Sequence, residues 1–128
     1  MQIIHDTFTA SAAGQLKFPE AVGALLSAGV ESYFVDTARM EEIAYLRDGS
    51  SVSHKMTLPP CMAASDFSAD RLIAAIRDAQ ADRIRYPEFL QRATAAGVLG
   101  YWAFLDGRQV VYIGRLGQQH IERFPDKN

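Results

Sequence analysis

The sequence contains a single cysteine, Cys61, among its 128 residues. One thiol cannot form an internal disulfide, so a hydrophobic core must stabilise the fold, which suits a reducing cytoplasm. The N-terminal residues lack the basic and apolar regions of a signal peptide. The apolar runs are also far shorter than the ~20 residues that span a bilayer. We therefore expect a cytoplasmic protein without a membrane partner.

A charge excess of either sign is missing as well. The formal net charge is -2, and no dense run of lysine and arginine occurs. Nucleic acids and anionic membranes are bound by clustered basic side chains. We therefore expect neither of them as a partner.

Catalytic and cofactor signatures are absent from the sequence. It contains no Walker A loop, no GxGxxG, no GxSxG, no CxxC and no EF-hand loop. Each of these motifs places backbone amides, a nucleophile or metal ligands where a known chemistry needs them. We therefore expect no cofactor, and the absence favours a protein that is not an enzyme.

What the sequence does contain is an internal repeat. Residues 18–33 read FPEAVGALLSAGVESY and residues 86–101 read YPEFLQRATAAGVLGY. An offset of 68 residues aligns the Pro-Glu pair, the Ala-Gly-Val run and the final tyrosine without a gap. Both the residues that start a helix and those that stop it are thereby kept in register.

The similarity extends to the end of each copy after a shift of one or two residues. SHKMTLP (53–59) resembles QHIERFP (119–125), which aligns His54 with His120. We therefore predict a single domain made of two repeats. The repeats cover about 1–59 and 68–128, and a linker at 60–67 joins them.

Each repeat is predicted to form two helices followed by three strands, which makes the fold class α+β. The helices begin at proline or serine and end at glycine or alanine, and Asp-Gly pairs mark hairpin turns. Helices are expected over about 2–13, 19–29, 68–81 and 87–97. Strands are expected over 31–36, 42–47, 51–58, 99–105, 110–114 and 118–124. Short turns imply antiparallel pairing with the helices on one face, in one six-stranded sheet or in two facing three-stranded sheets.

The arrangement FPE…AAGV…Y followed by YPEFL…AAGV…Y, GRxVxYxGRxG, a histidine and FP resembles one known family. The sequence is similar over nearly its full length to small bacterial proteins of the YbcV/YdfO type. That family is associated with prophages and often labelled "phage envelope protein". The resemblance implies an α+β fold without an established activity, and it implies no catalytic residues.

Two histidines are the first candidates for a site. His54 and His120 lie in the last strand of their repeats, and a two-fold arrangement could bring them together. Two imidazoles and a carboxylate can hold a transition metal. Glu122 lies on the same face of its strand as His120, and Asp36 is a further candidate carboxylate. The alternative, which we favour, is that both histidines are half-buried strand residues with structural hydrogen bonds.

Aromatic residues are the second candidates. Tyr101, Trp102 and Tyr112 crowd two neighbouring strands. Successive strand residues face opposite sides, so Tyr101 and Trp102 cannot both face the helices. One sheet face therefore either carries exposed aromatics that bind a ligand or partner, or is buried between the two repeats. The second alternative is favoured.

Other polar residues have simpler interpretations. Cys61 lies in the linker without a basic neighbour that would activate its thiol, so it is expected to be an inert apolar residue. Glu20 and Glu88 each follow a helix-initial proline, where a carboxylate favours the helix dipole. They are therefore predicted to cap helices.

These observations favour a non-enzymatic binding or protein-interaction module that can form a homodimer. Its partner, a protein or a small molecule, is not indicated. The competing hypothesis is a small metal-binding protein or enzyme centred on His54 and His120. A structural phage component is a third hypothesis, which rests on the family label alone.

Overall fold

The computed structural model describes residues 2–125, which form four helices and six strands. Two helices followed by three strands occur twice along the chain, which confirms the predicted α+β class. The first set is α1 (Gln2–Ala12), α2 (Phe18–Ser27), β1 (Val30–Asp36), β2 (Glu41–Leu46) and β3 (Ser51–Lys55). The second set is α3 (Ala69–Gln80), α4 (Tyr86–Ala95), β4 (Val98–Phe104), β5 (Gln109–Gly114) and β6 (Gln119–Arg123).

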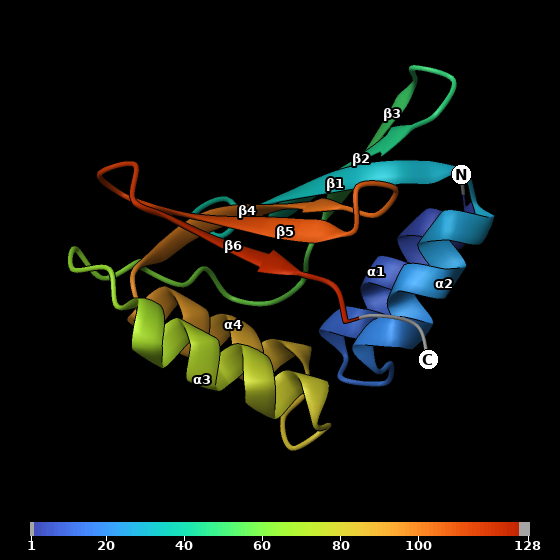
Figure 1. Ribbon diagram of the computed structural model, residues 1–128. Helices are drawn as coiled ribbons and strands as arrows, with labels where there is room; N and C mark the ends of the chain where they lie inside the picture. The colour runs from blue at the N-terminus through green and yellow to red at the C-terminus, as the bar shows by residue number, and fades with distance from the viewer. Residues whose placement is uncertain (1, 126–128) are drawn as a thin grey trace.

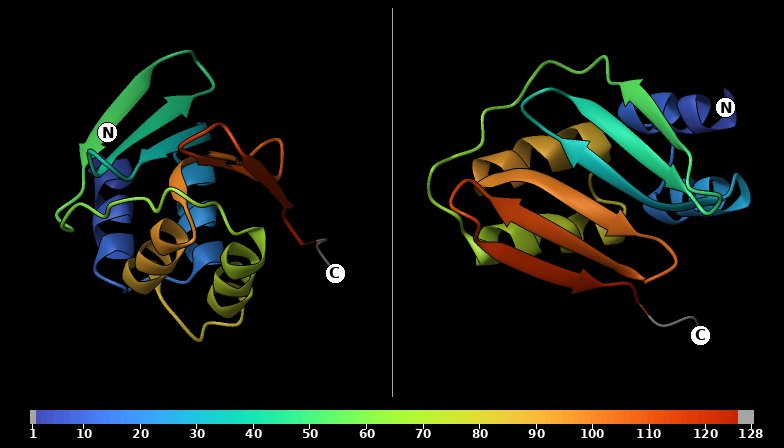
Figure 2. Two further views of the ribbon diagram at one scale, coloured as in Figure 1. Left: turned by 90° about the vertical axis from the view of Figure 1, so that its left-hand side faces the viewer. Right: turned by 90° about the horizontal axis from the view of Figure 1, so that it is seen from above.

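The strands form one antiparallel sheet in the order β3-β2-β1-β4-β5-β6. The alternative of two facing three-stranded sheets is therefore wrong, because β1 and β4 pair at the centre. Both helix pairs lie on the same face of this sheet (Figure 1). The opposite face is seen without helices in front of it in the right-hand view of Figure 2.

The helix boundaries follow from the predicted local signals. Pro19 stands in the first turn of α2, and the backbone N–H of Lys17 donates to the Glu20 carboxylate at 2.8 Å. This bond confirms the predicted capping role of Glu20. Gly29 and Gly97 follow α2 and α4 with φ of 90° and 101°, the left-handed conformation that glycine adopts without strain.

The third strand is shorter than the sequence predicts. β3 stops at Lys55 instead of residue 58. The N–H of Met56 still donates to the carbonyl of Met40 at 2.8 Å, and the chain then leaves the sheet. Pro59 and Pro60 follow, and because proline has no N–H to donate, the segment cannot continue a strand ladder.

The two sets of elements match at a constant offset of 68 residues. Val30 begins β1 and Val98 begins β4, and both strands carry a register shift after this first residue. The offset persists in the last strands, where Val52 pairs with Ala44 and His120 pairs with Tyr112. His120 therefore occupies the position of Val52, and the shifted alignment of His54 with His120 is wrong.

The core lies between the sheet and the helices, and two further contacts join the halves. The N–H and hydroxyl of Thr37 both donate to the carbonyl of Leu99 across the central strand pair. Arg47 and Asp106 form a bidentate ion pair at 2.8 and 2.9 Å.

Within residues 2–125, no helix has the length and apolar character that crossing a bilayer requires.

Candidate ligand-binding site

A cavity of about 100 Å³ lies beneath the sheet, between the two helix pairs, and opens to solvent. Both halves of the chain line it, because the helix pairs diverge on either side of the central strands (Figure 1). Its walls are mainly apolar and aromatic, with a few polar groups. The first half contributes Thr7, Phe8, Ser11, Leu16, Lys17, Phe18, Ala21, Leu25, Tyr33 and Glu42. The second half contributes mainly Ile76, Ala79, Gln80, Ile84, Tyr86, Phe89, Tyr101, Val110, Tyr112 and Glu122.

Four tyrosines belong to the aromatic part of the lining. The ring of Tyr101 lies 6.4 Å from that of Tyr33 and 5.3 Å from that of Tyr112, between centroids. The hydroxyls of Tyr101 and Tyr86 share a hydrogen bond of 2.5 Å. Burial raises the pKa of all four phenols, so they stay neutral in any physiological range. The tyrosines therefore contribute aromatic rings and hydroxyl groups to the lining, not phenolate charges.

Glu42 is the unusual residue of the cavity. It projects from β2, is only 2% exposed and lines the cavity wall. Its Oε1 atom is buried and has no hydrogen-bond partner among residues 2–125. Burial raises the pKa of this carboxyl well above its ordinary value. The neighbouring Tyr33 responds in turn, since burial and the nearby Glu42 both raise the pKa of its phenol.

The other acidic groups at the cavity are paired. Glu122 accepts from Arg77 at 2.7 Å and contacts the His120 Nε2 atom at 3.2 Å. Burial alone would raise the pKa of Glu122, but these two partners outweigh it and lower the pKa. At the mouth, Asp82 lies 2.7 Å from Arg85 and 3.9 Å from Lys17.

Many cavity residues form pairs that lie 68 positions apart. Tyr33 and Tyr101 are such a pair, at the centres of β1 and β4. Others at this offset are Phe8 with Ile76, Ser11 with Ala79, Leu16 with Ile84, Lys17 with Arg85, and Phe18 with Tyr86. Glu42 breaks the pattern, because the counterpart of its carboxyl is the apolar side chain of Val110.

The structure does not bring His54 and His120 together. They lie on β3 and β6, the two outer strands, five strand spacings or roughly 24 Å apart. A single site that contains both rings is therefore wrong. His54 instead contacts His5 of α1, Nδ1 to Nδ1, at 2.9 Å. In the part of the chain that the structure describes, no group of three metal-ligating side chains is close enough to hold an ion.

Trp102 lies on the opposite face of the sheet from the cavity. Its ring contacts those of Phe34, Tyr45 and Phe104 at centroid distances of 5.4 to 5.7 Å, and we call these four residues the open-face aromatic cluster. Because there is one sheet, this face is not buried between the two halves, and that prediction is wrong. Of the three aromatic candidates, Tyr101 and Tyr112 line the cavity and Trp102 does not.

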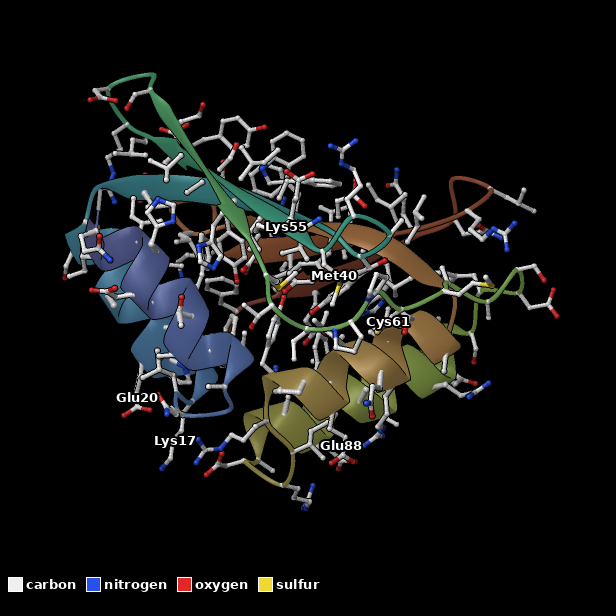
Figure 3. The ribbon with its side chains drawn as sticks, turned by 180° about the vertical axis from the view of Figure 1, so that it is seen from behind. Lys17, Glu20, Met40, Lys55, Cys61 and Glu88 are labelled. Atoms are coloured by element: carbon white, nitrogen blue, oxygen red, sulfur yellow. The ribbon has the colours of Figure 1, made fainter. Side chains whose placement is uncertain are left out.

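The remaining polar candidates lie away from the cavity floor. Figure 3 shows Cys61 on the linker, and Lys17, Glu20 and Glu88 at the helix ends remote from the sheet. Cys61 is partly buried, and its only recorded bond in the described chain is a weak contact to the carbonyl of Pro59.

Sequence reasoning missed Glu42 and Tyr86. The strand pattern of β2 contained the signal, because residues 42, 44 and 46 share one face and the latter two are alanine and leucine. A carboxylate on an apolar strand face faces the core, as residue 42 does here.

No protein-family model matches the chain, and no curated protein matches it in sequence. The resemblance to the YbcV/YdfO type therefore stays a prediction from the sequence. The candidate site is defined by its own geometry.

Proposed function

We propose that this protein is a small-molecule binding protein whose ligand occupies the tyrosine-lined cavity. The observation that carries the proposal is Glu42, a buried carboxyl whose Oε1 lacks a partner within residues 2–125 and which lines that cavity. A buried polar group without a hydrogen bond costs ~1–3 kcal/mol. Groups of this kind concentrate at functional sites, where a bound ligand supplies the missing interaction.

The rest of the cavity fits this role. Binding sites for small molecules combine apolar and aromatic walls with a few convergent polar groups. Here the buried polar groups include the Glu42 carboxyl and the hydroxyls of Tyr86 and Tyr101, and two helix pairs hold the walls. A catalytic assignment lacks comparable support, because the Glu42 carboxyl has no base or nucleophile bonded to it in the described chain.

A fragment screen by NMR tests the proposal. The full chain, labelled at its tyrosine rings, is mixed with a library of small organic compounds of varied charge. Compounds that bind should shift the ring signals of Tyr101 and Tyr112. Ala21→Phe should abolish these shifts because the new ring fills the cavity mouth.

Ser27→Phe is the matched control, since Ser27 is exposed on the same helix and lies outside the cavity. It should leave the shifts intact. The proposal fails if no compound moves the cavity tyrosines, or if shifts persist in a folded Ala21→Phe protein.

We also propose that the chain arose by duplication of a unit of two helices and three strands and that it works in the cytoplasm. The constant offset of 68 residues between matching elements supports the duplication. Reliance on an apolar core without a disulfide supports a reducing compartment.

Self-association through the open sheet face is a second proposal, with a second copy of this chain as the partner. The open-face aromatic cluster lies at the sheet centre, and the Nε1 of Trp102 is buried without an acceptor in residues 2–125. Matching strands lie on both sides of the central pair of β1 and β4. The open faces of two copies of the chain can therefore pack against each other about a two-fold axis. Sedimentation of the purified chain tests this, because a pure monomer at micromolar concentration would contradict it.

A further inference from the structure

We propose that the ligand of the tyrosine-lined cavity is a small organic cation, with the Glu42 carboxylate as its counter-ion and the tyrosine rings as its cage. This inference rests on the proposed binding function and names the chemical class of the ligand. It follows from the signs of the charges and the kinds of surface that the cavity offers.

The balance of charge inside the cavity is the first step. Glu122 and Asp82 are neutralised by Arg77 and by Arg85. Glu42 has no such partner, because no basic side chain in the described part of the chain lies within ion-pair distance of it.

Three cationic side chains also line the cavity: Lys17 and Arg85 lie next to Asp82, and Arg123 lies on β6, four strand spacings from β2. Glu42 is therefore the one carboxyl of the described cavity lining that a ligand cation would find without a basic partner.

The tyrosine rings are the second step. Tyr33, Tyr86 and Tyr101 line the cavity close enough to Glu42 for its charge to affect their phenols. Tyr112 continues the aromatic lining on β5, three strand spacings from β2, with its ring 6.2 Å from that of Phe89. The face of an aromatic ring carries partial negative charge and attracts cations, most strongly where water is excluded. An anion would be repelled by the carboxylate and by the negative faces of the rings. An apolar neutral ligand would leave the Oε1 atom of Glu42 unpaired.

The size of the cavity limits the cation. A volume of about 100 Å³ can hold several water molecules or one compact head group. A methylated ammonium group suits it, because its spread charge contacts several rings and needs few hydrogen bonds. Any longer part of the ligand would extend toward the mouth, where Phe18 and Phe124 meet edge to face at 5.6 Å.

Binding of a cation should release a proton. Burial raises the pKa of Glu42 in the empty cavity and so favours the neutral carboxylic acid, whereas an adjacent cation favours the carboxylate. The O–H bond of the carboxylic acid breaks, its electron pair stays on the oxygen, and the proton passes to the buffer. The affinity for a cation should therefore increase with pH, and the affinity for a neutral ligand should not.

The groups around Glu42 do not replace it in this role. Tyr33 on β1, Tyr86 on α4 and Tyr101 on β4 stay neutral because burial raises the pKa of each phenol. His54 on β3 is the cross-strand neighbour of Glu42. Burial and His5 lower its pKa, so His54 is neutral at pH 8 and supplies no counter-charge. The residues of α1 that line the cavity are uncharged.

Choline and its neutral isostere 3,3-dimethylbutan-1-ol test the inference, because a carbon atom replaces the quaternary nitrogen and the shape is kept. Both are titrated into the full chain at pH 8 while the ring signals of Tyr101 and Tyr112 are followed. Choline should bind at least tenfold more tightly than the alcohol. Its affinity should decrease from pH 8 to pH 6, with proton release visible by calorimetry in buffers of different ionisation enthalpy.

Two variants complete the test. Glu42→Gln keeps the size of the side chain without the charge, and it should reduce the preference for choline to the part that the aromatic rings supply. Glu41→Gln is the control, because Glu41 is the next residue of β2, faces the opposite side and pairs with Arg39. It should keep the preference for choline.

The outcomes separate the two proposals. Equal affinities for choline and the alcohol, or a preference for choline that is undiminished in Glu42→Gln, would overturn the cation inference and leave a binding cavity. The inference also fails if only neutral or anionic fragments shift the cavity tyrosines. If no compound shifts them, the binding function fails as well.

Discussion

Replacement of Glu42 by glutamine should change how the free energy of unfolding depends on pH. Burial raises the pKa of this carboxyl in the folded protein above its unfolded value. The stability that a protonated Glu42 gives is complete below about pH 4.5, the ordinary value of the unfolded group, and is lost as pH increases toward the raised folded pKa. The folded protein holds a proton in this window that the unfolded chain has released.

The size of the effect follows from proton linkage. One proton held only by the folded state changes the free energy of unfolding by at most about 1.4 kcal/mol per pH unit. Between pH 5 and pH 7, the wild type should therefore lose up to about 2.7 kcal/mol relative to Glu42→Gln. The glutamine amide keeps the shape and does not titrate, so the packing cost of the substitution is the same at every pH.

Urea unfolding at several pH values measures this difference. Trp102 is the single tryptophan and lies on the sheet face away from Glu42, so its fluorescence reports global unfolding in both proteins. Other titrating groups cancel in the comparison. Glu41→Gln is the control and should run parallel to the wild type from pH 5 to pH 7. Parallel curves for wild type and Glu42→Gln would refute the assignment of a buried neutral carboxyl.

Four further predictions can be checked with the same protein. Val110→Glu in the Glu42→Val background should restore the pH-dependent loss of stability, because Val110 lies at the matching cavity position and is 4% exposed. A double variant whose stability does not depend on pH would contradict the two-fold match. Tyr86→Phe should lower the free energy of unfolding in urea by ~1–3 kcal/mol, because it leaves the Tyr101 hydroxyl unpaired. The double variant Tyr86→Phe with Tyr101→Phe should lose less than the sum of the two single changes. Additive losses would contradict a shared hydrogen bond. Burial and His5 lower the pKa of His54, so the stability that neutral His54 gives is present above about pH 6.5 and lost at lower pH. The melting temperature of His54→Gln should therefore fall less on acidification than that of the wild type. An equal fall in both proteins would count against the His5 contact. Ile121→Lys on the open sheet face should weaken self-association at least tenfold in sedimentation, whereas Met62→Lys on the linker should not, and an equal effect of both would count against that face.

Much of the fold could be predicted because its signals are local. Proline and glycine mark the ends of α2 and α4, and the repeat shows that the same elements occur twice. The single sheet could not be predicted, since it depends on the pairing of β1 with β4. No local signal distinguishes that pairing from two facing sheets, because its partners, such as Val35 and Tyr101, lie far apart in the sequence.

The candidate site was predicted only in part, for a related reason. The strand aromatics Tyr101 and Tyr112 are predicted as ligand-binding candidates, and both line the cavity. His54 and His120 are candidates because of their residue type. Only the strand order shows that they lie on opposite edges of the sheet. Glu42 was missed because its importance depends on what surrounds it, namely a tyrosine contributed by α4 and a cavity formed between two helix pairs.

The pairing of Glu42 with Val110 across the cavity has a consequence for how a ligand is oriented. A floor with identical groups on both sides would accept a ligand in two equivalent poses, and that degeneracy is worth only about 0.4 kcal/mol of binding free energy. A single carboxyl removes one of the two poses, so the head of the ligand can lie on one side only. The protein can thereby distinguish the two ends of a molecule, although the scaffold that holds it is nearly symmetric.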